Sequence, residues 1–407
     1  MNDRVIFHVD VNSAFLSWES VWNLSNGGSE DYRKMLAAVG GDIETRHGII
    51  VAKSILTKPY GVTTGEPVVN ALRKCPNLVL IKPHHEIYKE YSKALMAILR
   101  EYTDTIEQFS IDEAFLDMTG TAKLFGPPVE AADRIRNRIR DTLGFTVNVG
   151  VSSNKLLAKM ASDFVKPDKT HTLWPEEVPS KMWPLPVGDL FFVGSSTAAK
   201  LNSLGIRTIG ELANSDRESL KGIFKSHGEY MYKAANGTDD SPVYSQSSDP
   251  KGYSNETTTS YDIVDSKEAL TILRSLTEKV SKRIRDDGVR IECVEVHLRY
   301  NTLKRVSRQC RVSAATNITD EIFDYVCSLF KEKWDGTPIR LLGVRLSDIT
   351  EESYRQISMF ESRDYEKLEK LDHALDEINT RFGTGTVKRA SGIKKKETET
   401  KNNDQTG

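Results

Sequence analysis

Two adjacent acids, Asp112 and Glu113, stand inside an otherwise apolar stretch, FSIDEAFLDM at 109–118. The apolar neighbours favour burial, but burying a carboxylate is costly in free energy unless a counter-charge or hydrogen-bond donors compensate it. A third acid, Asp10, follows the apolar run VIFHV. Like charges that converge cannot all stay ionised without a cation between them. The sequence therefore raises the question of what lies opposite these carboxylates.

Short strands are expected to position the three acids. The segment VIFHVD predicts a buried strand that ends at Asp10, and TIEQFS with EAFLDM predicts a hairpin that turns at Ile111 and Asp112. A strand end and a hairpin turn can meet at one edge of an antiparallel sheet, so the carboxylates can converge. Oxygen ligands suit Mg²⁺, and two ions about 3.5–4 Å apart are the usual device for in-line phosphoryl displacement. The alternative is that Asp112 and Glu113 are solvated turn residues.

Helices and strands alternate along the first half of the chain. Apolar spacing predicts helices at 86–101, 128–143 and 154–164. Two further strands are predicted at 49–52 and 145–152. Pro128 falls in the first turn of the second helix, and Gly144 follows its end. The order strand, helix, hairpin, helix, strand, helix is typical of an α+β fold with a largely antiparallel sheet.

Five motifs, taken as a set, carry a resemblance to a known family. They are HVDVNSAF at 8–15, YGVTTGEP at 60–67, SIDEAFLD at 110–117, VGVSSNKLLAKMASDFVKPD at 149–168 and VGSSTAAKLNSLGI at 193–206. With them the chain resembles the Y-family, translesion DNA polymerases of the bacterial DNA polymerase IV type from about residue 4 to residue 390. The resemblance implies a multidomain right-hand polymerase with palm, fingers, helical thumb and a small α/β little-finger domain. Such an enzyme adds dNTPs to a primer 3′ end with errors and has no proofreading domain.

The resemblance also gives roles to the acids and to one aromatic residue. Asp10, Asp112 and Glu113 would be the catalytic acids. Together with the backbone carbonyl of Val11 they would bind two Mg²⁺ ions. Phe15 would be the steric gate, whose ring would clash with a ribose 2′-hydroxyl and so favour deoxynucleotides. The alternative for Phe15 is a place in the core.

Basic residues are expected to contact the nucleotide. By the resemblance, Lys166 would contact the triphosphate from just past the 154–164 helix, and Lys58 would do so from the fingers. Ile55 and Lys58 stand where many members of the family carry a Tyr and an Arg. Lys58 keeps the charge but lacks the bidentate fork of an Arg, and Ile55 cannot hydrogen-bond. The alternative for the lysines around 154–166 is a solvated helix face.

The motifs and the composition of the segments between them predict the domain boundaries. Residues 237–260 are poor in apolar residues and rich in Ser, Thr, Asp and Gly, which indicates a linker. With the domain order that the resemblance implies, the expected boundaries are palm at 1–15 and 84–174, fingers at 16–83, thumb at 175–240, linker at 241–260, little finger at 261–352, a clamp-binding motif and terminal helix at 353–390, and a disordered tail at 391–407.

Charge is distributed unevenly although the formal net charge is only −2. Between Lys279 and Arg311 there are ten Lys or Arg and four acids, a net charge of +6. Arg299, Arg305 and Arg308 lie in predicted strands there, so one sheet face could meet DNA phosphates. In the thumb motif, backbone N–H groups at Gly194 could hold a further phosphate. The alternatives are a solvated basic face and a helix pair that only packs.

A short apolar string, QISMF at 356–360, resembles the pentapeptides with which bacterial polymerases bind the sliding clamp. Gln356 could hydrogen-bond while Met359 and Phe360 fill a pocket. The alternative is that Met359 and Phe360 pack under a helix predicted at 366–382.

Composition narrows the class of protein. No apolar run approaches the roughly 20 residues of a membrane span, and four scattered cysteines without a CxxC pair argue against a zinc site and for a reducing cytoplasm. The composition fits a cytoplasmic protein, and the resemblance implies a monomer that acts on primer-template DNA and dNTPs and binds the bacterial sliding clamp. The rival functions are a catalytically inactive DNA- and clamp-binding scaffold, and a nucleotide cyclase or other palm-like nucleotidyl transferase.

Overall fold

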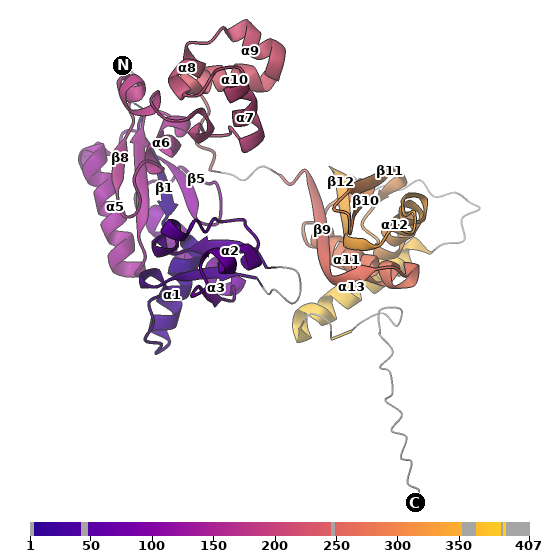
Figure 1. The fold of residues 1–407 in the computed structure, drawn as a ribbon. Helices are drawn as coiled ribbons and strands as arrows, with labels where there is room; N and C mark the ends of the chain where they lie inside the picture. Colours follow the sequence, from indigo (N-terminus) through magenta and orange to yellow (C-terminus); the bar gives the residue numbers. More distant parts are fainter. Residues whose placement is uncertain (1–3, 42–47, 246–248, 352–363, 384–385, 388–407) are drawn as a thin grey trace, which may run out of the picture. The chain divides into compact units, whose positions relative to one another are not determined.

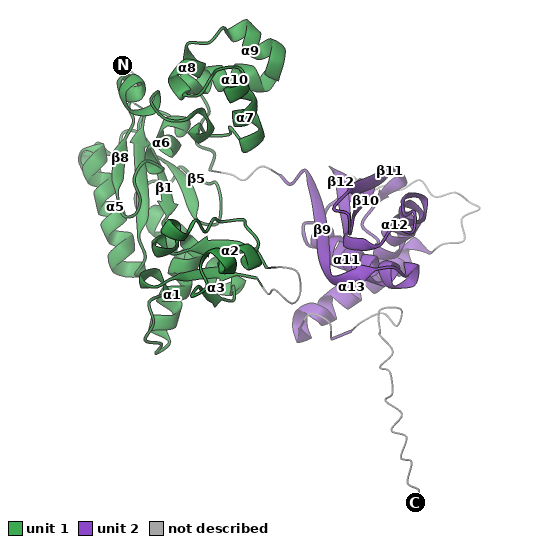
Figure 2. Cartoon of the chain, viewed as in Figure 1, with its two compact units in different colours: residues 1–43, 48–248 green, residues 44–47, 249–407 purple. Residues whose placement is uncertain are grey.

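The computed structural model describes residues 4–41, 48–245, 249–351, 364–383 and 386–387. The chain divides into two compact units, one of residues 1–43 and 48–248 and one of residues 249–407 with 44–47 (Figure 2). Among the described residues, no helix has the length and apolar character that a membrane crossing requires.

A five-stranded sheet forms the centre of the first unit (Figure 1). Its strand order is β5-β6-β1-β7-β8, and every pairing is antiparallel except that of β7 with β8. The bounds are Ile6–Val11 for β1, Ile106–Gln108 for β5, Glu113–Asp117 for β6, Val147–Ser152 for β7 and Thr170–Thr172 for β8. The predicted hairpin and the largely antiparallel α+β sheet are therefore confirmed.

The alternation of side chains along β1 gives its two faces different partners. Phe7, Val9 and Val11 enter a large apolar core with three helices, α1 (Ala14–Ser25), α3 (His85–Leu99) and α5 (Pro128–Leu143). Ile6, by contrast, packs with Ala158 of α6 (Lys155–Ser162). Because His8 and Asp10 share the face of Ile6, they are placed on the side where α6 lies. The helix predicted at 128–143 has these bounds in the structure, and Gly144 ends it at a φ of 74°.

A small three-stranded sheet of order β3-β2-β4 follows α1 in the chain. Its strands are β2 (Ala37–Gly40), β3 (Ile50–Lys53) and β4 (Val79–Ile81), and the short helices around it are η1 (Tyr32–Lys34), η2 (Ile55–Tyr60) and α2 (Val68–Lys74). Ala38, Ile50 and Val68 are fully buried in its core. The one-turn helix α4 (Ala122–Phe125) lies later in the chain, before α5.

Short helices make up the rest of the first unit. They are η3 (Pro175–Glu177), η4 (Val178–Met182), η5 (Val187–Asp189), α7 (Ser195–Ser203), α8 (Ile209–Ala213), α9 (Arg217–Phe224) and α10 (Ser226–Ala235). Their core is continuous with Leu156, Leu157 and Met160 of α6.

The second unit is a four-stranded antiparallel sheet with helices. The strand order is β11-β10-β12-β9, with bounds Gly252–Ile263 for β9, Arg290–Tyr300 for β10, Arg305–Thr316 for β11 and Ile339–Thr350 for β12. Helices α11 (Ser266–Asp286) and α12 (Thr319–Lys333) bury their apolar sides against it, and α13 (Tyr365–Phe382) follows. Buried Arg285 on α11 holds α13 through Asp376 at 2.7 Å and Asp372 at 3.4 Å.

The linker prediction for 241–260 was wrong at both ends. Residues 252–260 belong to β9, whose Thr257 and Thr258 pair with Leu342 and Leu341 of β12. The segment is poor in apolar residues because only one face of a strand in such a sheet needs to be apolar, and β-branched Thr suits a strand. At the other end, Val243 is buried with Ile6, Phe115 and Ala158 of the first unit.

Candidate active site

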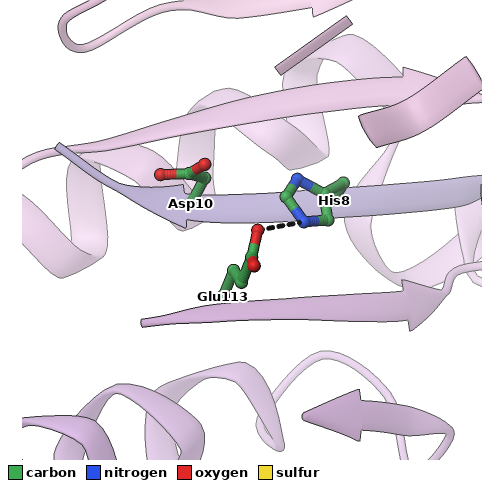
Figure 3. Close-up of side chains that lie close together, drawn as sticks. All are labelled: His8, Asp10 and Glu113. Carbon is green, nitrogen blue, oxygen red and sulfur yellow. Dashed lines mark ion pairs between the residues drawn. The ribbon is translucent and has the colours of Figure 1, made fainter. Parts of the chain in front are cut away.

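Asp10 and Glu113 face each other across the central strands. The register of β1 and β6 pairs these two residues directly. Their carboxylate oxygens and a ring nitrogen of His8 all lie within 4.8 Å of one another (Figure 3). Asp112, in the turn before β6, accepts a hydrogen bond from Ser110 Oγ at 2.6 Å, and its backbone carbonyl accepts one from Val11 N at 3.1 Å. The structure thus brings Asp10 and Glu113 together and puts Asp112 beside them.

Two lysines supply the positive charge opposite these acids. Lys159 Nζ lies 2.8 Å from Glu113 Oε2 and 3.3 Å from Asp10 Oδ2. Lys166 Nζ lies 3.0 Å from the same oxygen of Asp10. Both ammonium groups also pair with Asp163. In this structure Asp10 and Glu113 are therefore neutralised by lysine side chains from α6 and the segment after it.

Glu113 and Lys159 stay ionised although burial by itself disfavours the charged form of each. Burial by itself would raise the pKa of Glu113, but the contacts with His8 and Lys159 outweigh it and lower that pKa to about 2. Burial would lower the pKa of Lys159, but Asp10 and the other carboxylates raise it above its usual value. Burial, together with the negative charges of Asp10 and Glu113, raises the pKa of Asp112 despite its hydrogen bond from Ser110. Asp112 is thus the acid of the three that most lacks a compensating cation.

His8 is a site residue that sequence reasoning missed. It is fully buried, with Nδ1 2.8 Å from Ser162 Oγ and Nε2 3.1 Å from Glu113 Oε2. The Nε2 atom is not aligned for a hydrogen bond with any described group, and burial lowers the pKa of the ring. His8 precedes Asp10 by two residues, so the strand period places both on one face. That period was the signal in the sequence that could have revealed it.

A cavity of about 220 Å³ opens beside the acids. It brings together Asp112, Val11 and Phe15 with Lys58 and Ile55 of η2. These residues come from motifs that lie far apart in the sequence, and all of them except Ile55 were predicted as site residues. The cavity therefore joins the acid cluster to the residues that were expected to contact a nucleotide.

Phe15 is held from behind by other aromatic rings. Its ring centroid lies 4.8 Å from that of Tyr88 and 5.8 Å from that of Trp18. The Tyr88 hydroxyl donates a hydrogen bond to Glu19, a buried carboxylate that also accepts one from His84 N at 3.0 Å. Phe15 is thus both a core residue and a wall of the cavity, so its two predicted roles are compatible.

The predicted DNA contacts are distributed over several surfaces. Gly194 caps α7 at an ordinary φ of −75°. In the second unit, the register pairs Arg299 with Arg305, and both line one groove with Glu256 and His297.

Arg308 is not on the face of Arg299 and Arg305. It pairs with Val296 across the strands, on the apolar face of the sheet, and its guanidinium lies 2.9 Å from Glu332 of α12. Arg285 and Arg290 also pair with carboxylates, those of α13. Part of the positive charge counted in this region therefore holds helices in place.

The predicted clamp residues Gln356, Met359 and Phe360 lie outside the described residues.

Comparisons with known proteins agree on one family. Three models match the chain: the impB/mucB/samB family at residues 9–163, its HHH motif at 175–206 and its C-terminal domain at 250–359. The DNA polymerase IV of Clostridium acetobutylicum is 44% identical over 97% of this chain and 99% of its own length. The DNA polymerase IV 1 of Bacillus subtilis is 35% identical over 98% of this chain and 95% of its own length. A solved Y-family DNA polymerase chimera shares the fold, with a TM-score of 0.72, 24% identity and coverage of 85% of this chain and 99% of the chimera.

Proposed function

The chain belongs to the impB/mucB/samB family of Y-family DNA polymerases, and on this premise we propose that Asp10, Asp112 and Glu113 are its catalytic acids. It is a template-directed DNA polymerase of the translesion type that takes primer-template DNA and dNTPs and depends on divalent metal ions. The observation that carries the assignment is the convergence of Asp10 and Glu113 next to the cavity that Asp112 and Phe15 line.

The donor set suits a divalent cation with a preference for oxygen. The carboxylates of Asp10 and Glu113 converge, Asp112 lies in the turn beside them, and the raised pKa of Asp112 indicates that it lacks a counter-charge. Asp10, Asp112 and Glu113 with the carbonyl of Val11 would hold two Mg²⁺ ions. When bound, the ions would lower the pKa of the primer 3′-hydroxyl and stabilise the charge that develops on the phosphates. Lys159 would keep part of the negative charge of Asp10 and Glu113 compensated, and His8 would lie against the Glu113 carboxylate.

The remaining residues of the site would bind and select the nucleotide. The primer 3′-hydroxyl attacks the α-phosphate of a dNTP, and pyrophosphate leaves. The Phe15 ring, supported by Tyr88, would exclude a ribose 2′-hydroxyl. Lys58 lines the cavity and would attract the triphosphate. Lys166 would exchange its contact with Asp10 for one with a phosphate, since its side chain is 32% exposed and lies beyond the end of α6.

The remaining assignments extend the proposal to DNA and to a partner protein. Residues 1–15 and 84–174 would be the palm, 16–83 the fingers and 175–243 the thumb and the segment that returns to the palm, with a linker shortened to 244–251 before the little finger. Gly194 and the Arg299–Arg305 pair would contact DNA phosphates. Gln356, Met359 and Phe360 would bind the bacterial sliding clamp. We propose that the enzyme works as a monomer in the cytoplasm.

Primer extension separates this proposal from its rivals. The purified chain, a primer-template and all four dNTPs are incubated with and without Mg²⁺, and the products are resolved by length. We expect extension that follows the template and stops when the metal is chelated. An inactive scaffold would bind DNA without extending the primer, and a nucleotide cyclase would consume nucleotide without needing DNA. Either result would overturn the proposed function.

A further inference from the structure

The cavity beside the acids has a second basic residue on its wall, Lys53, which no sequence motif singled out. Lys53 is the last residue of β3, and it follows Val51, another lining residue, at the strand period of two. Lys58 of η2 lines the same cavity five residues later. Two lysines thus line a cavity that Asp112 also lines.

Within the described residues, Lys53 forms no ion pair, although it is half-buried. The carboxylate whose field favours its charge, Glu66, is already bound to Lys74 at 2.6 Å and to Thr63 N. Burial and the neighbouring charge of Lys58 lower the pKa of Lys53. The positive charges of Lys53 and Lys58 are therefore close to each other in a partly buried site, which favours the binding of an anion between them.

A third group on this wall lacks a partner. Ser54 is only 2% exposed, and its hydroxyl has no hydrogen-bond partner among the described groups. Ser54 lines the same cavity as Lys53. A buried hydroxyl without a partner costs free energy, so such a group in a native structure needs an explanation. A ligand oxygen in the cavity would accept its hydrogen bond.

Ile55 completes the wall without contributing a polar group. It is 46% exposed and lines the cavity, but its side chain cannot hydrogen-bond. The side-chain donors among the cavity-lining residues of β3, Ser54 and η2 are therefore two ammonium groups and one hydroxyl. Ammonium groups are common phosphate ligands, and charge-assisted hydrogen bonds to phosphate are the strong ones.

We propose that Lys53 and Ser54, together with Lys58, bind the β- and γ-phosphates of the incoming dNTP. The inference rests on the proposed function, because it takes the cavity to be the nucleotide site. Lys53 would add charge that Ile55 cannot supply, and the Ser54 hydroxyl would orient one phosphate oxygen. Removing the Lys53 ammonium or the Ser54 hydroxyl should therefore lower the affinity for nucleotides without abolishing the chemical step.

The test measures nucleotide binding apart from turnover. The full chain is bound to a primer-template with a dideoxy-terminated primer, and the dissociation constant of dATP with Mg²⁺ is measured by fluorescence titration. Lys53→Met should weaken dATP binding roughly ten- to hundredfold, which is the range of one charged hydrogen bond. Ser54→Ala should weaken it roughly three- to tenfold, in the range of one neutral hydrogen bond. Lys53→Arg should recover most of the affinity, because it restores the charge.

A matched control is Lys34→Met, which removes a lysine that is 83% exposed and does not line the cavity. Repeating the titration with dAMP, which lacks both outer phosphates, should show no difference between Lys53→Met and the wild type. If Lys53→Met binds dATP as well as Lys34→Met does, and both melt like the wild type, the inference is wrong. If the wild type itself binds no dATP, the proposed function fails instead, so the two failures are distinguishable.

Discussion

Replacing Lys159 by Met tests whether the acids depend on a buried counter-charge. The ammonium group contacts both Asp10 and Glu113, and its side chain is only 11% exposed. Removing one partner of a buried pair costs about 3–5 kcal/mol. The shift of the Glu113 pKa from 4.5 to about 2, to which His8 and Lys159 both contribute, corresponds to about 3 kcal/mol in total at 1.4 kcal/mol per unit. Because the site is partly open to water, we expect the free energy of unfolding to fall by about 2–3 kcal/mol.

Thermal unfolding followed by circular dichroism measures this loss. A fall of 2–3 kcal/mol corresponds to roughly 5–10 °C in the melting temperature of a unit of this size. The experiment is run at pH 8 with EDTA, and then with Mg²⁺. The metal ion should raise the melting temperature of Lys159→Met more than that of the wild type, because it replaces the missing positive charge.

The dependence on pH has a definite sign. A carboxylate whose folded-state pKa is depressed contributes stability that is present above its unfolded pKa and is lost as pH falls through the folded value. For Glu113 that window runs from 4.5 down to about 2. The difference between the wild type and Lys159→Met should therefore be largest at pH 8 and shrink below pH 4.5.

The control for this prediction is the same substitution at an exposed ion pair. Lys181 lies 2.6 Å from Glu177, and its side chain is 40% exposed. Lys181→Met should cost less than about 1 kcal/mol. If Lys159→Met loses no more stability than Lys181→Met, or if Mg²⁺ gives it no extra stabilisation, the acids do not depend on Lys159 as a counter-charge.

Three further changes address selectivity, DNA binding and recruitment. Phe15→Ala should raise ribonucleotide insertion at least roughly tenfold, on the scale of a lost steric contact; unchanged dNTP/rNTP discrimination in single-nucleotide insertion would place the gate elsewhere. Arg305→Ala should reduce the slope of log DNA affinity against log salt concentration by about one. Arg308→Ala, which loses the contact with Glu332, should leave that slope nearly unchanged, and equal slopes for the two variants would contradict the assignment of Arg305 to DNA phosphates. A variant with Gln356, Met359 and Phe360 all changed to Ala should keep its melting temperature and its clamp-free extension but lose stimulation by a loaded sliding clamp. Stimulation that survives would exclude QISMF as the tether.

The sequence predicted those parts of the site that depend on local spacing. The hairpin was evident from two short apolar runs on either side of Ile111 and Asp112, and the structure confirms it. The helix at 128–143 was bounded by Pro128 and Gly144. In both cases the signal lies within a few residues of the element that it defines.

Contacts that depend on how elements cross were harder to predict. Lys159 looked like one of several lysines on a helix face, because nothing local shows that α6 lies across β1 and turns this residue toward Asp10. The strand β9 was taken for a linker because its partner, β12, follows some 80 residues later in the chain. Arg308 is a different case, because its odd spacing of three from Arg305 already puts the two on opposite faces of a strand.

Asp10, Asp112 and Glu113 are proposed to act on the metal ions and not on DNA. Glu113→Gln is the most direct test, because it keeps the shape of the side chain and removes the charge that Lys159 and His8 face. Asp117→Asn, at the other end of β6, is the matched control. Single-turnover primer extension with Mg²⁺ is measured beside primer-template affinity. We expect Glu113→Gln to abolish extension and to leave DNA affinity within a few-fold of wild type, while Asp117→Asn extends normally. Extension by Glu113→Gln at a rate near that of the wild type would contradict the proposed role of the acids.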